Sequence, residues 1–176
     1  KRGFVVLAFD PSYNGESGGE PRHLSSPEIF SEDFSAGVDF LGSLDYVDRN
    51  KIGALGICGS GGFALSAAAM DTRIKAVVTS AMYDISAMGN NMSSDERNSM
   101  IIGLSEQRWT DFENGMPAYA RTYPADAPLT ELPADLTGTN VEWWTFYAMK
   151  RGWHPNSGGA FTNTSSLSFS NYSLLN

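Results

Sequence analysis

The chain has 176 residues, of which 41% are hydrophobic and 12% aromatic, a composition typical of a globular protein rather than a disordered segment. Its formal net charge of -8 argues against nucleic acid and anionic membrane surfaces as partners. No apolar run approaches the roughly 20 residues that a membrane-spanning helix needs. The single cysteine, Cys58, has no partner for an internal disulfide, and a free thiol suits a reducing compartment, so a cytoplasmic location is expected.

The first half of the chain alternates apolar strands with helices. Residues 4–9, in the run RGFVVLAFD, are continuously apolar, as in a parallel strand that is buried on both faces. A helix capped by Ser26 follows, then a strand over 52–57, a helix of small residues over 63–70 and a strand over 74–80. This order predicts an α/β fold in which three parallel strands are joined by helical crossovers. Since such a first strand needs neighbours on both sides, we expect an internal piece of a longer protein.

The second half has a different character. Residues 1–84 are predicted to form the α/β core and residues 85–176 a mainly helical cap insertion. The insertion begins with a helix capped by Ser94, with acidic residues in its first turn. An aromatic helix is predicted over 140–153, followed by a polar, irregular tail that returns towards the sheet.

The stretch KIGALGICGSGG joins the second strand to a helix through a turn of very small residues. A nucleophile elbow, the sharp strand-to-helix turn that presents a catalytic side chain, needs small residues on both sides of that side chain. With Cys58 as nucleophile, Gly56 lies two residues before it, and Ser60 and Gly61 lie two and three after it. With Ser60 as nucleophile, Cys58 and Gly62 take the small positions. We favour Cys58, because the apolar strand then runs directly up to the thiol.

The same turn also fits a phosphate cradle. Gly59, Gly61 and Ala64 have the spacing of a dinucleotide fingerprint with alanine in third place, and Asp84 lies where a ribose-binding acid is expected. An NAD(P)-dependent oxidoreductase using residues 59–64 is therefore an alternative. A glycine-rich strand-to-helix turn approximates this fingerprint easily, so the match is weakly specific.

Four motifs in order give a closer likeness: RGFVVLAFD, NGESGG, KIGALGICGSGG and IKAVVTSAMYD. Together they resemble the middle of an α/β-hydrolase, and more narrowly they are similar to the dienelactone-hydrolase-like group, which is related to peptidases that remove X-proline dipeptides. The resemblance covers residues 1–84, and the order of the motifs is more specific than any single one.

The resemblance implies a hydrolase of esters, lactones or thioesters that needs no cofactor. It implies that Cys58 is the nucleophile and that the Gly59 backbone N–H donates to the oxyanion. Ser60 stands where the family usually has glycine, which leaves it open as an alternative nucleophile. The triad histidine, and normally the acid, come from later strands, so the expected partners are a small-molecule acyl substrate and the remaining hydrolase-fold segments before Lys1 and after Asn176. A non-catalytic module that keeps only a pocket is a further alternative.

Other candidate residues have ordinary explanations beside the functional ones. Asp84 is a candidate triad acid, and also a candidate helix cap or turn residue. His23 suits a solvated loop, and His154 suits the end of the aromatic helix. Neither histidine is spaced for a metal site, and none is predicted. The following residues fit either an apolar substrate pocket or the core of the insertion: Met88, Met92, Met100, Trp109, Trp143, Trp144 and Tyr147.

Overall fold

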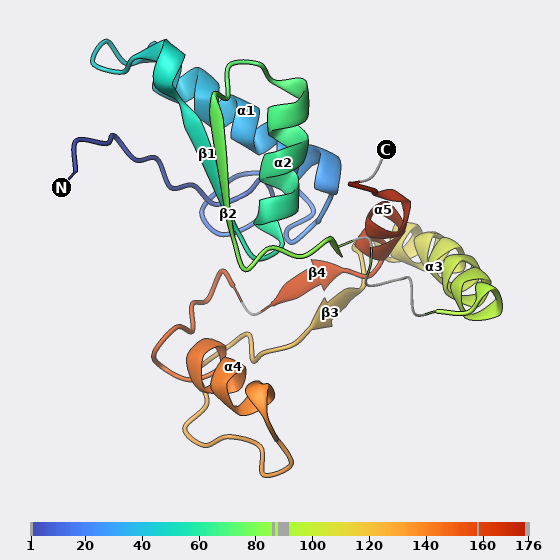
Figure 1. Ribbon diagram of the computed structural model, residues 1–176. Coiled ribbons are helices and arrows are strands. Elements are labelled where there is room, and N and C mark those ends of the chain that lie inside the picture. Colours follow the sequence, from blue (N-terminus) through green and yellow to red (C-terminus); the bar gives the residue numbers. More distant parts are fainter. Residues whose placement is uncertain (1, 86, 88–91, 158, 175–176) are drawn as a thin grey trace.

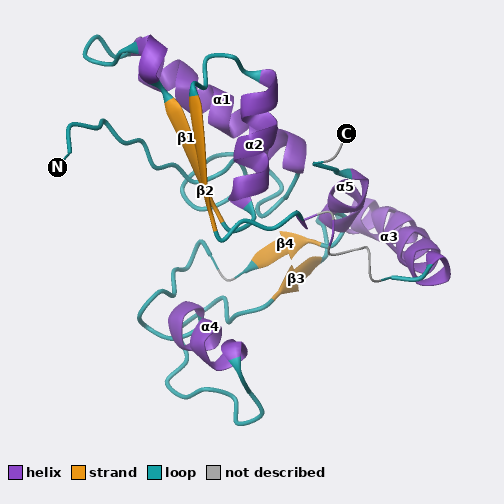
Figure 2. Ribbon diagram, in the orientation of Figure 1, coloured by secondary structure: helices purple, strands orange, loops and turns teal. Residues whose placement is uncertain are grey.

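The computed structural model describes residues 2–85, 87, 92–157 and 159–174. Figure 1 shows an α/β unit with two long helices beside two strands, and below it a second region with a short strand pair and three helices. In this second region helices and loops predominate over strands (Figure 2). The predicted change in character along the chain is therefore visible in the structure.

The sheet of the α/β unit has two strands, β1 (Gly53–Ile57) and β2 (Ala76–Ser80). They are parallel, and their register runs from the pair Gly53 and Ala76 to the pair Ile57 and Ser80. The crossover between them is the helix α2 (Ser60–Met70), and a short 3-10 turn (Arg49–Lys51) leads into β1. The parallel pairing through a helical crossover is as predicted.

The core lies between the sheet and two helices. Helix α1 (Pro27–Ser43) packs against α2, which in turn packs against both strands (Figure 1). The four buried hydrophobic residues of this core come from α1, the position just before β1, α2 and the segment before β2: Val38, Ile52, Ala67 and Ile74. Leu55 and Ile57, which point to the opposite face of β1, are exposed. Among the described residues, the helices α1 and α2 cover one face of the sheet, and Leu55 and Ile57 leave the other face exposed.

Helix α1 begins where the sequence predicts. Ser26 has extended backbone and Pro27 takes the first helical position, where its missing N–H is not needed. The Ser26 hydroxyl donates to the Glu28 carboxylate at 2.8 Å instead of accepting from a backbone N–H. The boundary is therefore confirmed, whereas the predicted side-chain cap is absent at this helix end.

The strand predicted over residues 4–9 is not formed. Within the described residues, the segment has no hydrogen-bonded strand neighbour, and Phe4 and Val6 are 81% and 82% exposed. Only its second half is anchored, through Leu7 and Phe9, which approach α1; the rings of Phe9 and Phe34 lie 5.6 Å apart, edge to face. An apolar run alone does not make a strand, because the ladder requires a partner for its backbone N–H and C=O groups. The three-stranded sheet we predicted is therefore wrong for this structure.

The second region opens with the long helix α3 (Ser94–Asn114). Its cap is Ser93, one residue before the predicted one, and Ser93 and Glu96 form a capping box in which each side chain accepts from the other residue's backbone N–H. The helix ends at Gly115, which has left-handed backbone. The aromatic helix α4 (Thr139–Tyr147) is shorter than predicted, since it ends six residues before Trp153.

The tail is more regular than the sequence suggests. Strand β4 (Ala160–Thr162) pairs antiparallel with β3 (Tyr119–Arg121), and helix α5 (Ser165–Asn171) follows. The prediction of an irregular tail is wrong, because three-residue strands separated by about forty residues leave no local periodicity to detect.

The tail does return to the α/β unit, as predicted. The Ser165 hydroxyl accepts from the Ser25 N–H at 2.9 Å, and the Tyr172 and Ser66 hydroxyls are hydrogen-bonded at 2.6 Å. The division at residue 84 remains a prediction.

Candidate active site

Cys58 lies at the sharp turn between β1 and α2. Its backbone φ is +59°, in the left-handed region that non-glycine residues rarely adopt, and its side chain is exposed. Its N–H donates to the Ser80 carbonyl at 2.9 Å, so the last ladder hydrogen bond of the sheet holds the turn in place. A strained, exposed residue between a strand and a helix has the geometry of a nucleophile elbow.

Two glycines make this turn possible. A Cβ on Gly56 would lie 2.5 Å from both the Gly61 Cα and the Ser60 carbonyl oxygen, and a Cβ on Gly61 would lie 2.5 Å from the Met82 Cγ. Both distances are far below van der Waals contact. The close approach of β1 to α2, and of α2 to the segment after β2, therefore requires glycine at positions 56 and 61. The small residues expected around Cys58 are thus required by backbone packing.

Ser60 has a structural place in the turn. Its hydroxyl accepts from the Ile57 N–H and donates to the Ile57 carbonyl, both at 2.8 Å. The side chain therefore folds back onto the end of β1, and both of its hydrogen bonds serve the turn. Ser60 as the nucleophile stays a prediction, since its hydroxyl would first have to leave these partners.

Gly59 supplies a free backbone donor beside the thiol. It is the N-cap of α2, and within the described residues its N–H donates to no other group, whereas the Gly61 and Gly62 N–H groups donate to the carbonyls of Cys58 and Gly59. A free N–H at a helix N-terminus attracts negative charge. This arrangement is suitable for holding an oxyanion next to Cys58.

The segment after β2 turns back over the elbow. Ala81 has a φ of +49°, and beyond it the Met82 side chain covers Gly61 while the Tyr83 hydroxyl lies above Gly59. Burial raises the pKa of Tyr83, and the charge of Cys58 raises it further. Sequence reasoning missed Tyr83; its position directly before Asp84, just past a strand end, is the only signal for it.

Asp84 lies close to a different hydroxyl. Its charge, like that of Glu28, raises the pKa of Tyr172, although burial is the main cause of that shift. The Tyr172 hydroxyl donates to the Gly62 carbonyl at 3.3 Å, on α2. The structure therefore places the Asp84 charge near Tyr172 in the C-terminal tail. The roles of Asp84 as triad acid or ribose ligand remain predictions.

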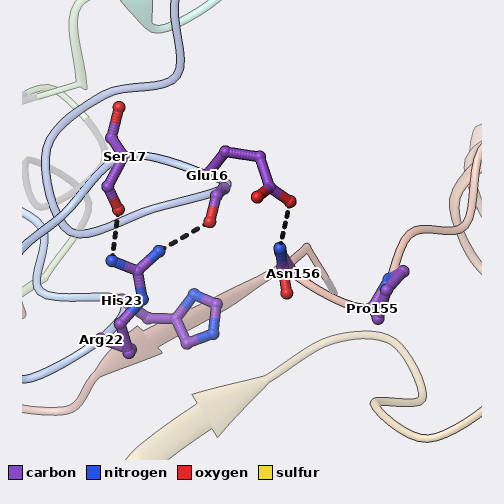
Figure 3. A pocket seen from close by; sticks show the side chains of 7 residues that line it. Glu16, Ser17, Arg22, His23, Pro155 and Asn156 are labelled. Carbon is purple, nitrogen blue, oxygen red and sulfur yellow. Dashed lines mark hydrogen bonds between the residues drawn. The ribbon is translucent and has the colours of Figure 1, made fainter.

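The two histidines lie away from the elbow in their described contacts. His23 lines a polar cavity of about 330 Å³ together with Arg22, Glu16 and Asn156 (Figure 3). Arg22 donates to loop carbonyls there, and Asn156 donates to Glu16 at 2.6 Å. Burial, followed by the nearby Arg121 and Arg22, lowers the pKa of His23. Cys58 is not among the residues that line this cavity.

His154 does not end the aromatic helix. It is exposed seven residues beyond Tyr147, and its Nδ1 accepts from the Asn156 N–H at 3.2 Å. The predicted interaction with the helix dipole is therefore wrong, because that effect is limited to the last turn. The hydrogen bonds and ring contacts described for the two histidines do not involve Cys58.

The aromatic candidates that the structure describes lie in different surroundings. Met88 lies outside the described residues. Trp109 on α3 is 73% exposed, whereas the Trp144 ring packs edge to face on Tyr123 at 5.3 Å, and Tyr147 stacks on the same ring at 5.5 Å. Trp144 and Tyr147 of α4 therefore pack against a residue of the same second region.

The helix end at Gly59 is poorly suited to a dinucleotide. A pyrophosphate needs open space above the glycines of the turn, but Tyr83 and Ile85 lie over Gly59 and Met82 lies over Gly61. Among the described residues, no group of three or more potential metal ligands is found, and no helix has the length and apolarity to cross a membrane.

Solved structures define the class of the fold. The crystal structure of the hypothetical protein PA2218 from Pseudomonas aeruginosa matches with a TM-score of 0.85 and 47% identity, covering 98% of this chain and 54% of that chain. The α/β hydrolase GrgF from Penicillium sp. sh18 matches with a TM-score of 0.70 and 20% identity, covering 94% of this chain and 54% of that one. The predicted partial α/β-hydrolase fold is confirmed.

The family follows from the sequence comparisons. Residues 31–127, more than half of the chain, match the family model described as BAAT / Acyl-CoA thioester hydrolase C terminal, and the chain belongs to this family. The uncharacterized protein PA2218 of P. aeruginosa is 47% identical over 183 residues, which cover 99% of this chain and 48% of that protein. The thiohydrolase aneE of Aspergillus aculeatus is 39% identical over 79 residues, 45% of this chain and 25% of that protein. The chain spans about half the length of PA2218.

Proposed function

We propose that the protein is a hydrolase of thioesters or esters in which Cys58 is the nucleophile. The observation that carries this proposal is the left-handed backbone of an exposed cysteine at the end of β1, next to the free Gly59 N–H. The membership of an acyl-CoA thioester hydrolase family and the likeness to a thiohydrolase support the substrate class. The narrower likeness to dienelactone hydrolases, and lactones as substrates, remain part of the prediction.

In the proposed reaction the Cys58 thiolate attacks the carbonyl carbon of the acyl group. A carbon–sulfur bond forms, and the carbonyl π electrons move to oxygen, where the Gly59 N–H stabilises the negative charge. When the carbonyl re-forms, the leaving thiolate or alkoxide departs and takes a proton from a general acid. Water then hydrolyses the Cys58 acyl thioester, which releases the carboxylic acid and regenerates the thiolate.

A histidine is expected to act as the base and acid in both steps. By resemblance to the α/β-hydrolases, we expect this histidine outside residues 1–176, since the hydrogen bonds and ring contacts described for His23 and His154 do not involve Cys58. The proposal therefore concerns the full-length protein, with a small acyl compound as substrate and a cytoplasmic location as a further, separate prediction.

The test uses the full-length protein with an acyl-CoA thioester and a p-nitrophenyl ester as substrates. Cys58→Ala is expected to abolish turnover of both and to leave the circular-dichroism spectrum unchanged. Mass spectrometry of a quenched reaction should find the acyl group on the peptide that contains Cys58.

The matched control is Ser60→Ala. This variant loses the turn hydrogen bonds of Ser60, which are worth about 1 kcal/mol each, and should still turn over substrate below its melting temperature. If Ser60→Ala is folded and inactive while Cys58→Ala is active, Ser60 is the nucleophile. If the native protein neither turns over nor becomes acylated, the non-catalytic alternative is correct.

A further inference from the structure

The polar cavity beside His23 lies where the α/β unit meets the second region. Its lining comes from residues 15–17 and 22–23 of the loop before α1 and from residues 155–156 of the second region. Phe30 in the first turn of α1 packs on Phe63 in the first turn of α2, with ring centroids 5.3 Å apart. The loop before α1 therefore lies at the same end of the α/β unit as the elbow (Figure 1).

Arg22 is held in the wall of this cavity by backbone carbonyls. Its Nη1 donates to the Ser17 carbonyl and, at 3.3 Å, to the Gly19 carbonyl, and its Nη2 donates to the Gly15 carbonyl at 2.7 Å. A guanidinium has five N–H groups, and the other two of Arg22 donate to no group among the described residues. No carboxylate in the described part of the chain forms an ion pair with this guanidinium, since Glu20 accepts only from the Arg22 backbone N–H.

His23 is fixed beside Arg22 by contacts with the second region. Its carbonyl accepts from the Thr162 N–H at 3.1 Å, and its ring packs edge to face on the Tyr119 ring at 6.2 Å. Figure 3 shows this ring between the Arg22 guanidinium and the Asn156 side chain. Both strands β3 and β4 thus help to hold the imidazole at the cavity.

The charges that act on the imidazole are positive. After burial, Arg121 of β3 and then Arg22 lower the pKa of His23. Arg121, like Arg22, forms no ion pair among the described residues. The carboxylate in the lining belongs to Glu16, which accepts from the Asn156 side chain at 2.6 Å and lies beside that residue in Figure 3. A chain with a net charge of -8 therefore carries two unpaired guanidinium groups near this cavity.

We infer that the cavity binds a small anion, a phosphate or carboxylate group, through the two remaining N–H groups of Arg22 and the ring of His23. A guanidinium whose other donors are already fixed loses little side-chain freedom when an oxyanion binds, and its fork matches the geometry of both groups. The volume of about 330 Å³ leaves room for part of the molecule that carries the anion. The site is separate from the elbow, because Cys58 is not among its lining residues.

The direct test is calorimetric titration of the full-length protein with inorganic phosphate and with acetate at constant ionic strength. Arg22→Gln should weaken binding at least about tenfold, because it removes charge-assisted hydrogen bonds. Lys75→Gln is the matched control, since it removes the same charge just before β2, where the Lys75 Nζ donates to the Thr72 carbonyl. It should bind as the native protein does. Equal losses in both variants, or no binding of either anion to the native protein up to about 10 mM, would overturn the inference.

Glu16→Gln tests the sign of the charge that the cavity prefers. The glutamine keeps an acceptor for Asn156 and removes the negative charge, so phosphate binding should become about two- to fivefold tighter. Weaker binding would indicate a site for a cation and would overturn the inference. Arg121→Gln should weaken binding by a similar factor. It replaces Arg22→Gln if that variant does not fold, because the Arg121 side chain donates to no described group.

Coenzyme A distinguishes two sources of the anion. If it displaces inorganic phosphate, the site takes a phosphate of an acyl-CoA substrate, and Arg22→Gln should raise KM for an acyl-CoA thioester but not for a p-nitrophenyl ester. If it does not, the site takes a free anion. Phosphate binding requires no turnover, so binding to a protein without esterase or thioesterase activity would support the site and refute the proposed function. An active protein that binds neither anion would do the reverse.

Discussion

Cys58 and Ala81 occupy equivalent places at the carboxyl ends of two neighbouring parallel strands. Each directly follows one member of the last register pair, Ile57 and Ser80, and each has left-handed backbone, with φ of 59° and 49°. Such a conformation costs a non-glycine residue about 1–2 kcal/mol, and here two of them meet side by side. Both strands therefore end at the same level. The chain presents the Cys58 thiol after β1, and after β2 it turns back so that the Tyr83 hydroxyl lies over Gly59.

The left-handed backbone of Ala81 predicts how substitutions at this position change stability. Ala81→Val should lower the free energy of unfolding by about 1–3 kcal/mol, because a β-branched side chain tolerates positive φ worse than alanine does. Ala81→Gly should leave it unchanged or raise it slightly, since relief of strain is offset by the entropy of glycine in the unfolded chain. Urea denaturation measures both. The control is Ala76→Val within β2, where the extended backbone suits valine. If Ala81→Val left the free energy of unfolding unchanged, Ala81 would be unstrained.

Two glycines with opposite surroundings give a second prediction. Gly56→Ala should lower the free energy of unfolding by about 1–3 kcal/mol, because its Cβ would overlap the backbone of Ser60 and Gly61. Gly103→Ala should raise it by about 0.5–1 kcal/mol, since Gly103 lies inside α3 with open space around it and alanine favours the helix. Denaturation curves of the two variants should therefore shift in opposite directions. Equal shifts would contradict the close approach of β1 and α2 at the elbow.

The ion pair between Asp71 and Arg73 predicts how the free energy of unfolding depends on pH below neutrality. Arg73 donates to Asp71 through Nε at 2.9 Å and Nη2 at 2.7 Å, and these hydrogen bonds hold the pKa of Asp71 far below its ordinary value of 3.8. The folded state thus keeps the carboxylate charged at a pH where the unfolded chain protonates it. The contribution is complete above about pH 5 and is lost as the pH falls from there towards the folded pKa.

The experiment compares the free energy of unfolding between pH 5 and pH 3 in the native protein and Asp71→Asn. The asparagine variant should show a shallower fall of stability with acid. Arg73→Gln should also flatten the slope, although it removes the ion pair of Arg73 with Asp39 as well. The effects of the two single variants on the slope should therefore be less than additive in the double variant, because both remove the interaction between Asp71 and Arg73. Independent, additive effects of the two variants would contradict the coupling of this pair.

Local patterns in the sequence were sufficient to predict the strand-to-helix turn at Cys58 and the elements that flank it. The strand over 52–57, the small-residue turn and the helix that follows are contiguous, so their periodicity and glycine content can be read without knowing any distant contact. The same holds for the start of α1 at Pro27 and, within one residue, for the cap of α3. Each of these features depends on backbone groups only a few residues apart.

The remaining features depend on contacts between segments that are far apart in the sequence. Residues 4–9 are as apolar as any strand in the chain, yet they stay unpaired in the described structure, because a ladder depends on a neighbour and not on composition. The pairing of β3 with β4 and the docking of Tyr172 on α2 join segments that the sequence holds far apart. Tyr83 is the clearest case, because the turn at Ala81 brings its hydroxyl over Gly59. Proximity of side chains across a sheet edge is set by strand register and backbone reversal, which leave no periodic pattern in the sequence.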